Sequence, residues 1–309
     1  MTGSSGFVGR WLAPALRERY PQTMITCLNR RPDGRSSADN IIVDLLDAER
    51  LTFAIDGLKP DLVIHLAAQS SIGRAHASAN STWVSNVSGS LNLALAVADC
   101  APRATVLFAS TAEVYGASFL GGPASELTPL QPMNAYAKSK ALAERMFADV
   151  LPETAQLIIA RPFNHTGPGQ SSDFVLPSFA GQIARIEAGS CAAVVAVGNL
   201  EAQRDFLDVR DVVGAYLALI EKAPTLPMRF AVNIASGRAW PLSELLEKLR
   251  ELARIPFVVK VDPARLRRVE LPIMTADPSL LKALTGWRLR YPIERTLSDI
   301  LESCRAAPP

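Results

Sequence analysis

Short apolar runs alternate with longer segments of helical periodicity through the first half of the chain. The apolar runs occupy residues 24–28, 41–43, 62–66, 105–109 and 157–160. The segments that predict helices occupy residues 10–19, 48–55, 82–99 and 137–150. Continuous apolar runs are typical of parallel strands buried on both faces, and the strand–helix alternation predicts a doubly wound α/β sheet. After residue 161 the stretch RPFNHTGPGQSSD predicts a long functional loop, followed by short mixed elements.

Three glycines, Gly3, Gly6 and Gly9, open the chain in the stretch TGSSGFVG. This spacing is typical of a loop whose N–H groups, with a helix dipole, hold the phosphates of a dinucleotide. Gly3 would permit the tight turn, Gly6 the approach of the pyrophosphate, and Gly9 the close packing of the helix on the sheet. Such a loop normally follows a strand, so we expect an upstream strand in the natural protein. Taken alone, the three residues could equally form an ordinary glycine turn.

Asn29, Arg30 and Arg31 follow the run 24–28, where many NAD-binding proteins place an acid for the ribose hydroxyls. Two guanidinium groups suit a 2′-phosphate, so NADP(H) is favoured and NAD(H) is the second candidate. A solvated basic turn is the alternative interpretation. Asp44 and Leu45 could hold an adenine through a carboxylate acceptor and an apolar cover, or Asp44 could cap the next helix.

Tyr136 and Lys140, in YAKSK, are four residues apart and share one face of a predicted helix. An ammonium near a phenol stabilises the phenolate and lowers its pKa from about 10 toward neutrality. Tyr136 would then exchange a proton at neutral pH. Such pairs also occur by chance on surfaces, but Thr111, in STAEVYG, adds a hydroxyl at the sheet edge where ligands bind.

The composition excludes several classes of function. A net charge of +2 over 309 residues argues against nucleic acid or an anionic membrane as the main partner. No apolar run approaches the roughly 20 residues that span a bilayer, and the start lacks a signal-peptide pattern, so we expect a cytoplasmic protein. Four scattered cysteines and three scattered histidines predict no metal site.

Together these motifs resemble the extended short-chain dehydrogenase/reductase family, whose members modify nucleotide sugars. The resemblance covers nearly the whole chain and rests on TGSSGFVG, Asp44-Leu45, HLAAQ (65–69), NVSGSLN (86–92), STAEVYG, YAKSK and RPFN (161–164). It implies a Rossmann-type doubly wound parallel sheet with a smaller C-terminal α/β subdomain. The dinucleotide-binding domain would comprise residues 1–162 and about 206–235, and the substrate domain residues 163–205 and 236–309. The family also implies a homodimer through the helices 82–99 and 137–150.

The resemblance assigns roles to individual residues. Thr111 would be the catalytic hydroxyl, Tyr136 the acid or base, and Lys140 its partner and a ligand of the nicotinamide ribose, while Asn86 would steady the catalytic region. The implied cofactor-binding residues are Gly3, Ser5, Gly6, Phe7, Val8, Asn29, Arg30, Arg31, Asp44, Leu45, Leu66, Ala67, Ala68, Gln69, Asn86, Ala109, Tyr136, Lys140, Arg161 and Phe163. The implied substrate-binding residues are Ser70, Ala112, Glu113, Asn164, His165, Val175, Asn199, Arg204 and Arg267.

Two segments narrow the expected reaction. Ala112 replaces the aspartate that dTDP-glucose dehydratases carry there, although Glu113 still matches the base of GDP-mannose dehydratases. The loop 161–170 resembles that of GDP-6-deoxy-D-mannose reductases, which implies NAD(P)H-dependent reduction of a C4 ketone on a GDP-sugar. Arg204 and Arg267 would clamp the diphosphate, although Arg267 could equally be a surface charge. Residues 268–270 (RVE) depart from the reductases, which tend to have proline and aspartate there.

Two other functions remain open at this point. A nucleotide-sugar 4-epimerase would hold NAD tightly and show no net redox change. A cofactor-sensing regulatory protein could share the same fold, but such proteins usually lose the tyrosine or the lysine, and both remain here.

Overall fold

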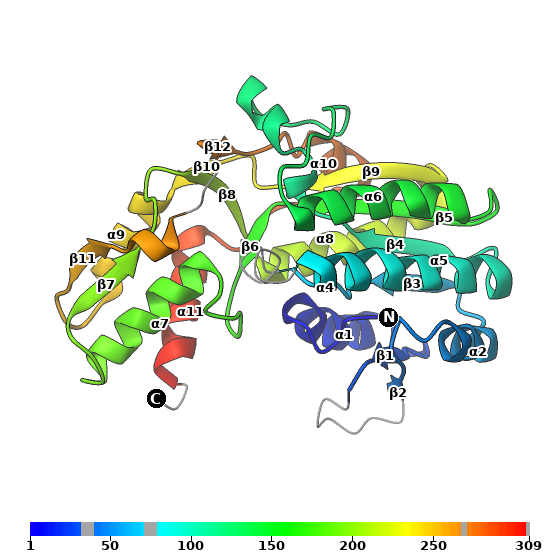
Figure 1. The fold of residues 1–309 in the computed structure, drawn as a ribbon, viewed down its shortest axis with the longest axis horizontal. Helices are drawn as coiled ribbons and strands as arrows, with labels where there is room; N and C mark the ends of the chain where they lie inside the picture. The colour runs from blue at the N-terminus through cyan, green and yellow to red at the C-terminus, as the bar shows by residue number, and fades with distance from the viewer. Residues whose placement is uncertain (32–39, 71–78, 267–270, 307–309) are drawn as a thin grey trace.

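A parallel sheet of four strands forms the centre of the larger lobe in the computed structural model, which describes residues 1–31, 40–70, 79–266 and 271–306 (Figure 1). The strands, in spatial order, are β3 (Leu62–His65), β4 (Thr105–Ala109), β5 (Gln156–Pro162) and β9 (Arg229–Ile234). The central residues of β3, β4 and β5 are largely buried, which explains why their sequences are continuous apolar runs.

Two further strands, β1 (Cys27–Asn29) and β2 (Asn40–Ile42), pair in parallel beside this sheet. Thr2 forms parallel bridges to Leu28 of β1 and to His65 of β3. The backbone N–H of Thr2 donates to Ile64 O at 2.9 Å, and that of Leu28 donates to Met1 O at 2.8 Å. Residues 1–2 therefore lie where a strand between β1 and β3 would lie. The expected upstream strand stays a prediction.

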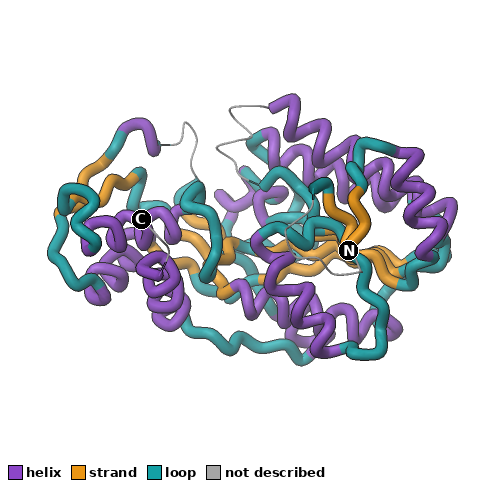
Figure 2. Tube along the Cα trace, turned by 90° about the horizontal axis from the view of Figure 1, so that it is seen from below, coloured by secondary structure: helices purple, strands orange, loops and turns teal. Residues whose placement is uncertain are grey.

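Helices cover both faces of the sheet (Figure 2). On one face lie α2 (Ala48–Leu58), α5 (Gly89–Cys100) and α6 (Ala135–Val150), and on the other lie α1 (Phe7–Arg19), α8 (Val209–Lys222) and α10 (Ser279–Thr285). Val106 and Phe108 of β4 belong to the apolar core under α2, α5 and α6. Leu107 belongs to the apolar core under α1, α8 and α10. Successive side chains of a strand point to opposite faces, so β4 contributes to both. The predicted doubly wound α/β fold is confirmed.

The smaller lobe has its own apolar core. It is formed by α7 (Val175–Glu187), α9 (Leu242–Leu252) and α11 (Ile293–Ala306) with the paired strands β7 (Val194–Val197) and β11 (Val258–Val261). Next to the larger lobe lies β8 (Gln203–Asp208), which pairs with β6 (Asn164–Thr166), β10 (Ala239–Pro241) and β12 (Ile273–Met274). The long loop expected after residue 161 is therefore interrupted by β6, which pairs with β8.

The helix expected over residues 82–99 is present, but it is not α-helical throughout. The structure has α4 (Ala79–Trp83), a π-helical turn (Val84–Ser88) and then α5.

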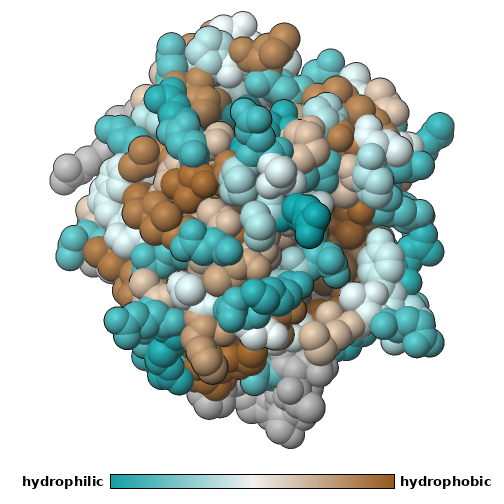
Figure 3. Space-filling model, turned by 90° about the vertical axis from the view of Figure 1, so that its right-hand side faces the viewer, coloured by the Kyte–Doolittle hydropathy of each residue, from teal (hydrophilic) through white to brown (hydrophobic). Residues whose placement is uncertain are grey.

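In the part of the chain that the structure describes, no helix has the length and apolar character needed to cross a bilayer. At the end of the larger lobe farthest from the smaller one, apolar and polar side chains are interspersed on the surface (Figure 3).

Candidate active site

A cavity of about 300 Å³ lies at the carboxyl ends of the larger lobe's strands, where β6 and the start of α7 meet that edge. The glycine loop, the ends of β3, β4 and β5, and the first turns of α6 supply the rest of its wall. The following predicted site residues line it: Gly3, Gly6, Phe7, Val8, Leu66, Ala68, Ser70, Ala109, Thr111, Glu113, Tyr136, Lys140, Phe163, Asn164, His165 and Val175. Tertiary structure thus gathers residues from both lobes into one site.

The glycine loop accepts no side chain at two of its positions. Gly3 has φ +74°, and a Cβ there would lie 2.6 Å from the backbone nitrogen of Ala67. A Cβ on Gly9 would lie 2.2 Å from Gly3 O. Gly9 therefore allows α1 to pack against the loop itself, rather than against the sheet as expected. Helix α1 begins at Phe7 with Gly6 as its N-cap, so its first N–H groups are placed to receive an anion.

Asn29 does not present its side chain to a ligand as expected. It is buried, its Oδ1 accepts from Ser4 Oγ at 2.9 Å, and its Nδ2 donates to Asn40 Oδ1 at 3.3 Å. The amide thus ties the glycine loop to β2, because a buried polar group must find partners. Arg30 and Arg31 follow it on the surface.

Asp44 lies in the loop after β2, where it could either hold an adenine or cap the next helix. Asp47, not Asp44, is the N-cap of α2, so the helix-cap alternative for Asp44 is wrong. The Asp44 carboxylate instead accepts from the backbone N–H two residues later, at 3.0 Å. Leu45 O accepts from Asn92 Nδ2 at 2.8 Å, which fastens this loop to α5. Neither Asp44 nor Leu45 lines the described cavity.

A chain of buried hydrogen bonds fixes the tautomer of His65. Ser90 Oγ donates to Asn86 O at 2.7 Å, so it accepts from His65 Nε2 at 2.9 Å. His65 Nδ1 then accepts from Thr2 Oγ1 at 2.7 Å, and that oxygen accepts from the N–H of Ala67 at 3.2 Å. Burial lowers the pKa of His65 to about 3, so the imidazole is neutral.

Asn86 steadies the catalytic helix from the centre of the π-helical turn. Its Oδ1 accepts from the N–H of Gln69 at 2.8 Å, and its Nδ2 donates to Gln69 O at 3.2 Å and to Ser139 Oγ at 3.0 Å. Ser139 lies between Tyr136 and Lys140 in sequence and donates to Tyr136 O at 2.8 Å. The π turn interrupts the helix at the residue that makes these bonds, a placement common at functional sites.

The phenol of Tyr136 is held protonated. Burial raises its pKa to about 12, its hydrogen bond with Thr111 lowers the pKa, and the Glu113 carboxylate raises it. The prediction that Lys140 would bring this pKa toward neutrality is therefore wrong for this structure. Desolvation of the phenolate outweighs the favourable contact, which comes from a hydroxyl.

Lys140, one turn after Tyr136 on the same helix α6, is almost completely buried. Its Nζ donates to Ala109 O at 2.6 Å and lies 4.6 Å from the centre of the Phe108 ring. Burial lowers the pKa of Lys140 to about 7, and the Glu144 carboxylate raises it. A carbonyl and a ring face both stabilise an ammonium, so the contacts favour the charged form that burial opposes.

The segment around β6 brings the smaller lobe against the glycine loop. The His165 ring is stacked on that of Phe7, with centroids 6.2 Å apart and an interplanar angle of 5°. His165 Nδ1 donates to Phe163 O at 2.9 Å, and burial lowers the pKa of this imidazole. Asn164, between them, lines the cavity.

Several cavity residues were not predicted. They are Ser110, Pro162, Thr166, Gln170, Asp173, Phe174, Leu176, Pro177, Phe206 and Tyr216. Gly9, which was expected to serve helix packing, also lines the cavity. Thr166 Oγ1 and Gln170 Oε1 are buried and have no partner among the described residues. The Gly- and Pro-rich stretch HTGPGQ is the signal that could have identified this pair, because polar residues in such loops often bind ligands.

Two predicted arginines are turned inward instead of facing the cavity. Arg161 forms a buried ion pair with Glu144 (Nη2–Oε2 2.6 Å). Arg204 is buried and donates to Gln203 O and Leu271 O, each at 2.8 Å, so it holds β8 to the segment before β12. Neither lines the described cavity. Buried guanidinium groups need several acceptors, and these two find them in protein.

The remaining predicted residues lie elsewhere. Ala112 is buried in the apolar core, and Ser5 is exposed. Asn199 is exposed, and its Oδ1 accepts from the N–H of Glu201 at 2.9 Å. Ala67 and Gln69 hold the wall through their backbones. Arg267 lies outside the described residues. Among those described, no cluster of His, Cys, Asp or Glu could hold a metal ion.

Comparisons with known proteins agree with this site. Residues 1–235 match the model of the NAD dependent epimerase/dehydratase family. A GDP-6-deoxy-D-mannose reductase of Pseudomonas aeruginosa is 35% identical over 303 residues, which cover 97% of this chain and 95% of that protein. A GDP-6-deoxy-D-talose 4-dehydrogenase of Aggregatibacter actinomycetemcomitans is 26% identical over 300 residues, 97% of this chain and 95% of that protein.

A solved structure shows the same architecture. RMD from Pseudomonas aeruginosa complexed with NADPH superposes with a TM-score of 0.83 and 32% identity, covering 98% of this chain and 97% of that one. The family model matches most of the chain, and the match includes the glycine loop, Thr111, Tyr136 and Lys140. This protein therefore belongs to the NAD dependent epimerase/dehydratase family, whose members fold as extended short-chain dehydrogenases/reductases.

Proposed function

We propose that this protein is an NAD(P)H-dependent reductase that converts GDP-4-dehydro-6-deoxy-D-mannose to GDP-6-deoxy-D-mannose. The observation that carries the proposal is the meeting of Thr111, Tyr136 and Lys140 at one cavity. The chain is also similar over nearly its whole length to a reductase of that name. The larger lobe would bind the dinucleotide and the smaller lobe the sugar nucleotide.

The residues present fit a dinucleotide. Side chains at Gly3 and Gly9 would collide with backbone, so the loop stays narrow beside the first N–H groups of α1, which would hold the pyrophosphate. Arg30 and Arg31, exposed at the end of β1, would hold a 2′-phosphate. These two charges favour NADP(H) over NAD(H). When bound, the cofactor supplies the hydride that reduces the C4 ketone.

The chain's own residues supply the proton and orient the ketone. Tyr136 is protonated at neutral pH, because burial raises its pKa to about 12, and it donates its proton to the oxygen that becomes the C4 hydroxyl. Thr111 hydrogen bonds to the same oxygen and orients it. The Lys140 ammonium stabilises the phenolate that remains and holds the nicotinamide ribose.

The substrate would bind along the part of the wall contributed by the smaller lobe. Asn164 and His165 of β6, with Val175 at the start of α7, line that part of the cavity. Glu113, from the larger lobe, accepts from Asn134 Nδ2 at 3.3 Å and would contact the sugar. Thr166 and Gln170 add buried polar atoms without protein partners among the described residues.

The test is the absorbance of the reduced nicotinamide in the presence of GDP-4-dehydro-6-deoxy-D-mannose, with NADPH and then with NADH. Tyr136→Phe should abolish oxidation and retain NADPH binding. Tyr20→Phe, which removes a phenolic hydroxyl outside the described cavity, is the matched control and should oxidise NADPH at the wild-type rate.

Two outcomes would change the assignment. Folded protein that binds NADPH but oxidises none with this substrate would reject it. Conversion of a nucleotide sugar without NADPH consumption, by protein purified with NAD bound, would identify a 4-epimerase instead.

We also propose that the protein is a cytoplasmic homodimer. Leu95 of α5 and Leu142 of α6 are each 46% exposed, on helices that cover the same face of the sheet (Figure 1). A second copy that packed on these helices would bury both side chains. The four cysteines are free, which fits a reducing compartment.

A further inference from the structure

A buried ion pair lies directly beside the candidate active site. Arg161 Nη2 is 2.6 Å from Glu144 Oε2, and Arg161 Nε is 3.0 Å from Glu144 Oε1. The two residues are 6% and 3% exposed. Arg161 Nη1 also donates to Tyr115 Oη at 3.0 Å, and Tyr115 Oη donates to Asn233 Oδ1 at 2.7 Å. Charges this deeply buried are tolerated only with good geometry, so the carboxylate of Glu144 is firmly placed.

The same carboxylate holds the end of β4. Ser110 Oγ donates to Glu144 Oε1, and the N–H of Ser110 donates to Ala160 O at 2.7 Å. Ser110 directly precedes Thr111 and lines the cavity. The position of the Thr111 hydroxyl therefore depends on a bond between β4 and α6 that Glu144 accepts.

Glu144 is also one helical turn beyond Lys140 on α6, a spacing that places the two side chains on one face. Lys140 itself contacts Ala109 O and the Phe108 ring. The titratable and charged groups around it are Glu144 and Tyr136 on α6, His65 on β3, Arg161 on β5 behind Glu144, and Glu113 beside Tyr136. Of these, His65 and Tyr136 are neutral, and Glu144 supplies the negative charge that favours the Lys140 ammonium.

We propose that Glu144 is a positioning residue of the reductase: held by Arg161, it keeps Lys140 in the ammonium form and fixes the strand end that carries Thr111. This inference rests on the proposed function. The Glu144 carboxylate would have two roles: its charge favours the Lys140 ammonium, and its Oε1 accepts the hydrogen bond from Ser110 Oγ. A residue that served only the fold would affect neither the protonation of Lys140 nor the turnover of a stable variant.

The test replaces the pair with neutral side chains, because Glu144→Gln alone would leave the Arg161 charge buried and unpaired. The double variant Glu144→Gln/Arg161→Met should move the alkaline limb of kcat/KM to lower pH by about one unit, as Lys140 loses its proton sooner. Ser110→Ala keeps the charge and should lower kcat several-fold without moving this limb.

The smaller lobe contains an ion pair that serves as a matched control for the double variant. Glu187 and Arg305 form an ion pair of the same bidentate kind, with both contacts 2.6 Å long, and neither residue lines the cavity. Glu187→Gln/Arg305→Met should lower the melting temperature but leave the pH limb in place.

A substrate-free readout separates this inference from the proposed function. Lys140 would hold the ribose, so NADPH affinity, followed by fluorescence titration, should weaken at high pH about one unit earlier in the Glu144→Gln/Arg161→Met variant. This shift would support the role of Glu144 even if the wild type reduced a different substrate. A folded double variant with both pH dependences unchanged would overturn the inference.

Discussion

At the scale of single residues, burial is the largest influence on the pKa values of three site residues. It raises the pKa of Tyr136 to about 12, lowers that of Lys140 to about 7 and lowers that of His65 to about 3. Each direction favours the neutral form, as expected when water is removed from a charge. A protonated phenol suits a reductase, because reduction of a ketone consumes a proton.

His65 should make the protein sensitive to acid. Its pKa is about 3 in the folded state and about 6.5 in the unfolded state, so between these values the unfolded chain binds more protons. Stability should therefore fall as pH decreases from about 6.5, with His65 accounting for about 1 kcal/mol by pH 5.5. Thermal unfolding of wild type and His65→Gln across this range measures the effect. A parallel loss in both proteins would contradict it.

Thr166 should contact the substrate. Its hydroxyl is buried at the cavity wall with no partner among the described residues, and Thr166→Val keeps the shape while removing the hydrogen bond. One lost hydrogen bond of about 1 kcal/mol should raise KM roughly five-fold, with the Kd of NADPH unchanged. Steady-state kinetics test this, with the exposed Thr154→Val as the control. An unchanged KM would show that Thr166 makes no contact with the substrate.

At the scale of elements, the glycine loop positions the site through close backbone contacts, and the π-helical turn does so through the Asn86 side chain. Gly3 and Gly9 let the loop fold against Ala67 and against itself, while Asn86 joins the loop after β3 to the catalytic helix α6. These contacts connect segments from three parts of the chain. The elements therefore place the cavity wall, and the side chains of Thr111, Tyr136 and Lys140 depend on that placement.

Alanine should have different effects at two glycine positions: at Gly9 it should abolish NADPH binding, and at Gly57 it should stabilise the fold. A Cβ on Gly9 would meet backbone atoms of Gly3 and Ser4 at 2.2 and 2.6 Å, so Gly9→Ala should shift the loop and abolish NADPH binding. Gly57, inside α2, has no atom within 4 Å of the point where a Cβ would lie, so Gly57→Ala should raise the unfolding free energy by about 0.5–1 kcal/mol. Fluorescence titration and chemical denaturation measure the two effects. Normal NADPH affinity in Gly9→Ala would contradict the role given to the loop.

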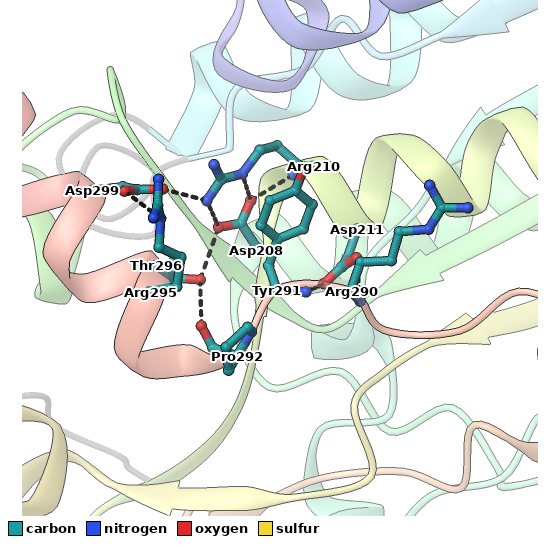
Figure 4. A network of polar contacts seen from close by, with 9 residues as sticks. All are labelled: Asp208, Arg210, Asp211, Arg290, Tyr291, Pro292, Arg295, Thr296 and Asp299. Carbon is teal, nitrogen blue, oxygen red and sulfur yellow. Dashed lines mark hydrogen bonds and ion pairs between the residues drawn. The ribbon is translucent and has the colours of Figure 1, made fainter.

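At the scale of the whole molecule, a polar network fastens the two lobes (Figure 4). Asp208 caps α8, and Arg210 binds both Asp208 and, at 2.7 Å, Asp299 of α11. Thr296 Oγ1 of α11 donates to Asp208 Oδ2 at 2.8 Å. One carboxylate thus joins the start of α8 to α11, so the lobes that form the cavity wall are held together away from the cavity.

The proposed dimer can be tested at one exposed side chain. Leu142→Glu places a charge on the face of α6 that a second copy would cover, so it should convert the dimer to a monomer. Light scattering after size-exclusion chromatography measures the mass. Leu252→Glu, on an exposed position of α9 in the smaller lobe, is the control and should leave the mass unchanged. A wild type that is already monomeric would reject the dimer.

The sequence by itself determined the features that depend on local spacing. Apolar runs predicted β3, β4 and β5, because strands buried on both faces need apolar side chains on both. The four-residue spacing of Tyr136 and Lys140 placed both on one face of α6. The glycine spacing identified the loop that opens α1. The family followed from these motifs together.

Only the tertiary structure decided which polar groups face the cavity. Asn29, Arg161 and Arg204 looked like ligand-binding residues, but each is buried and bonded to partners 11 or more residues away, at Asn40, Glu144 and Leu271. The spacing of Tyr136 and Lys140 likewise could not show that burial would raise the pKa of the Tyr136 phenol. Hydrogen-bond partners and desolvation depend on segments that meet only when the chain has folded, so no local pattern contains them.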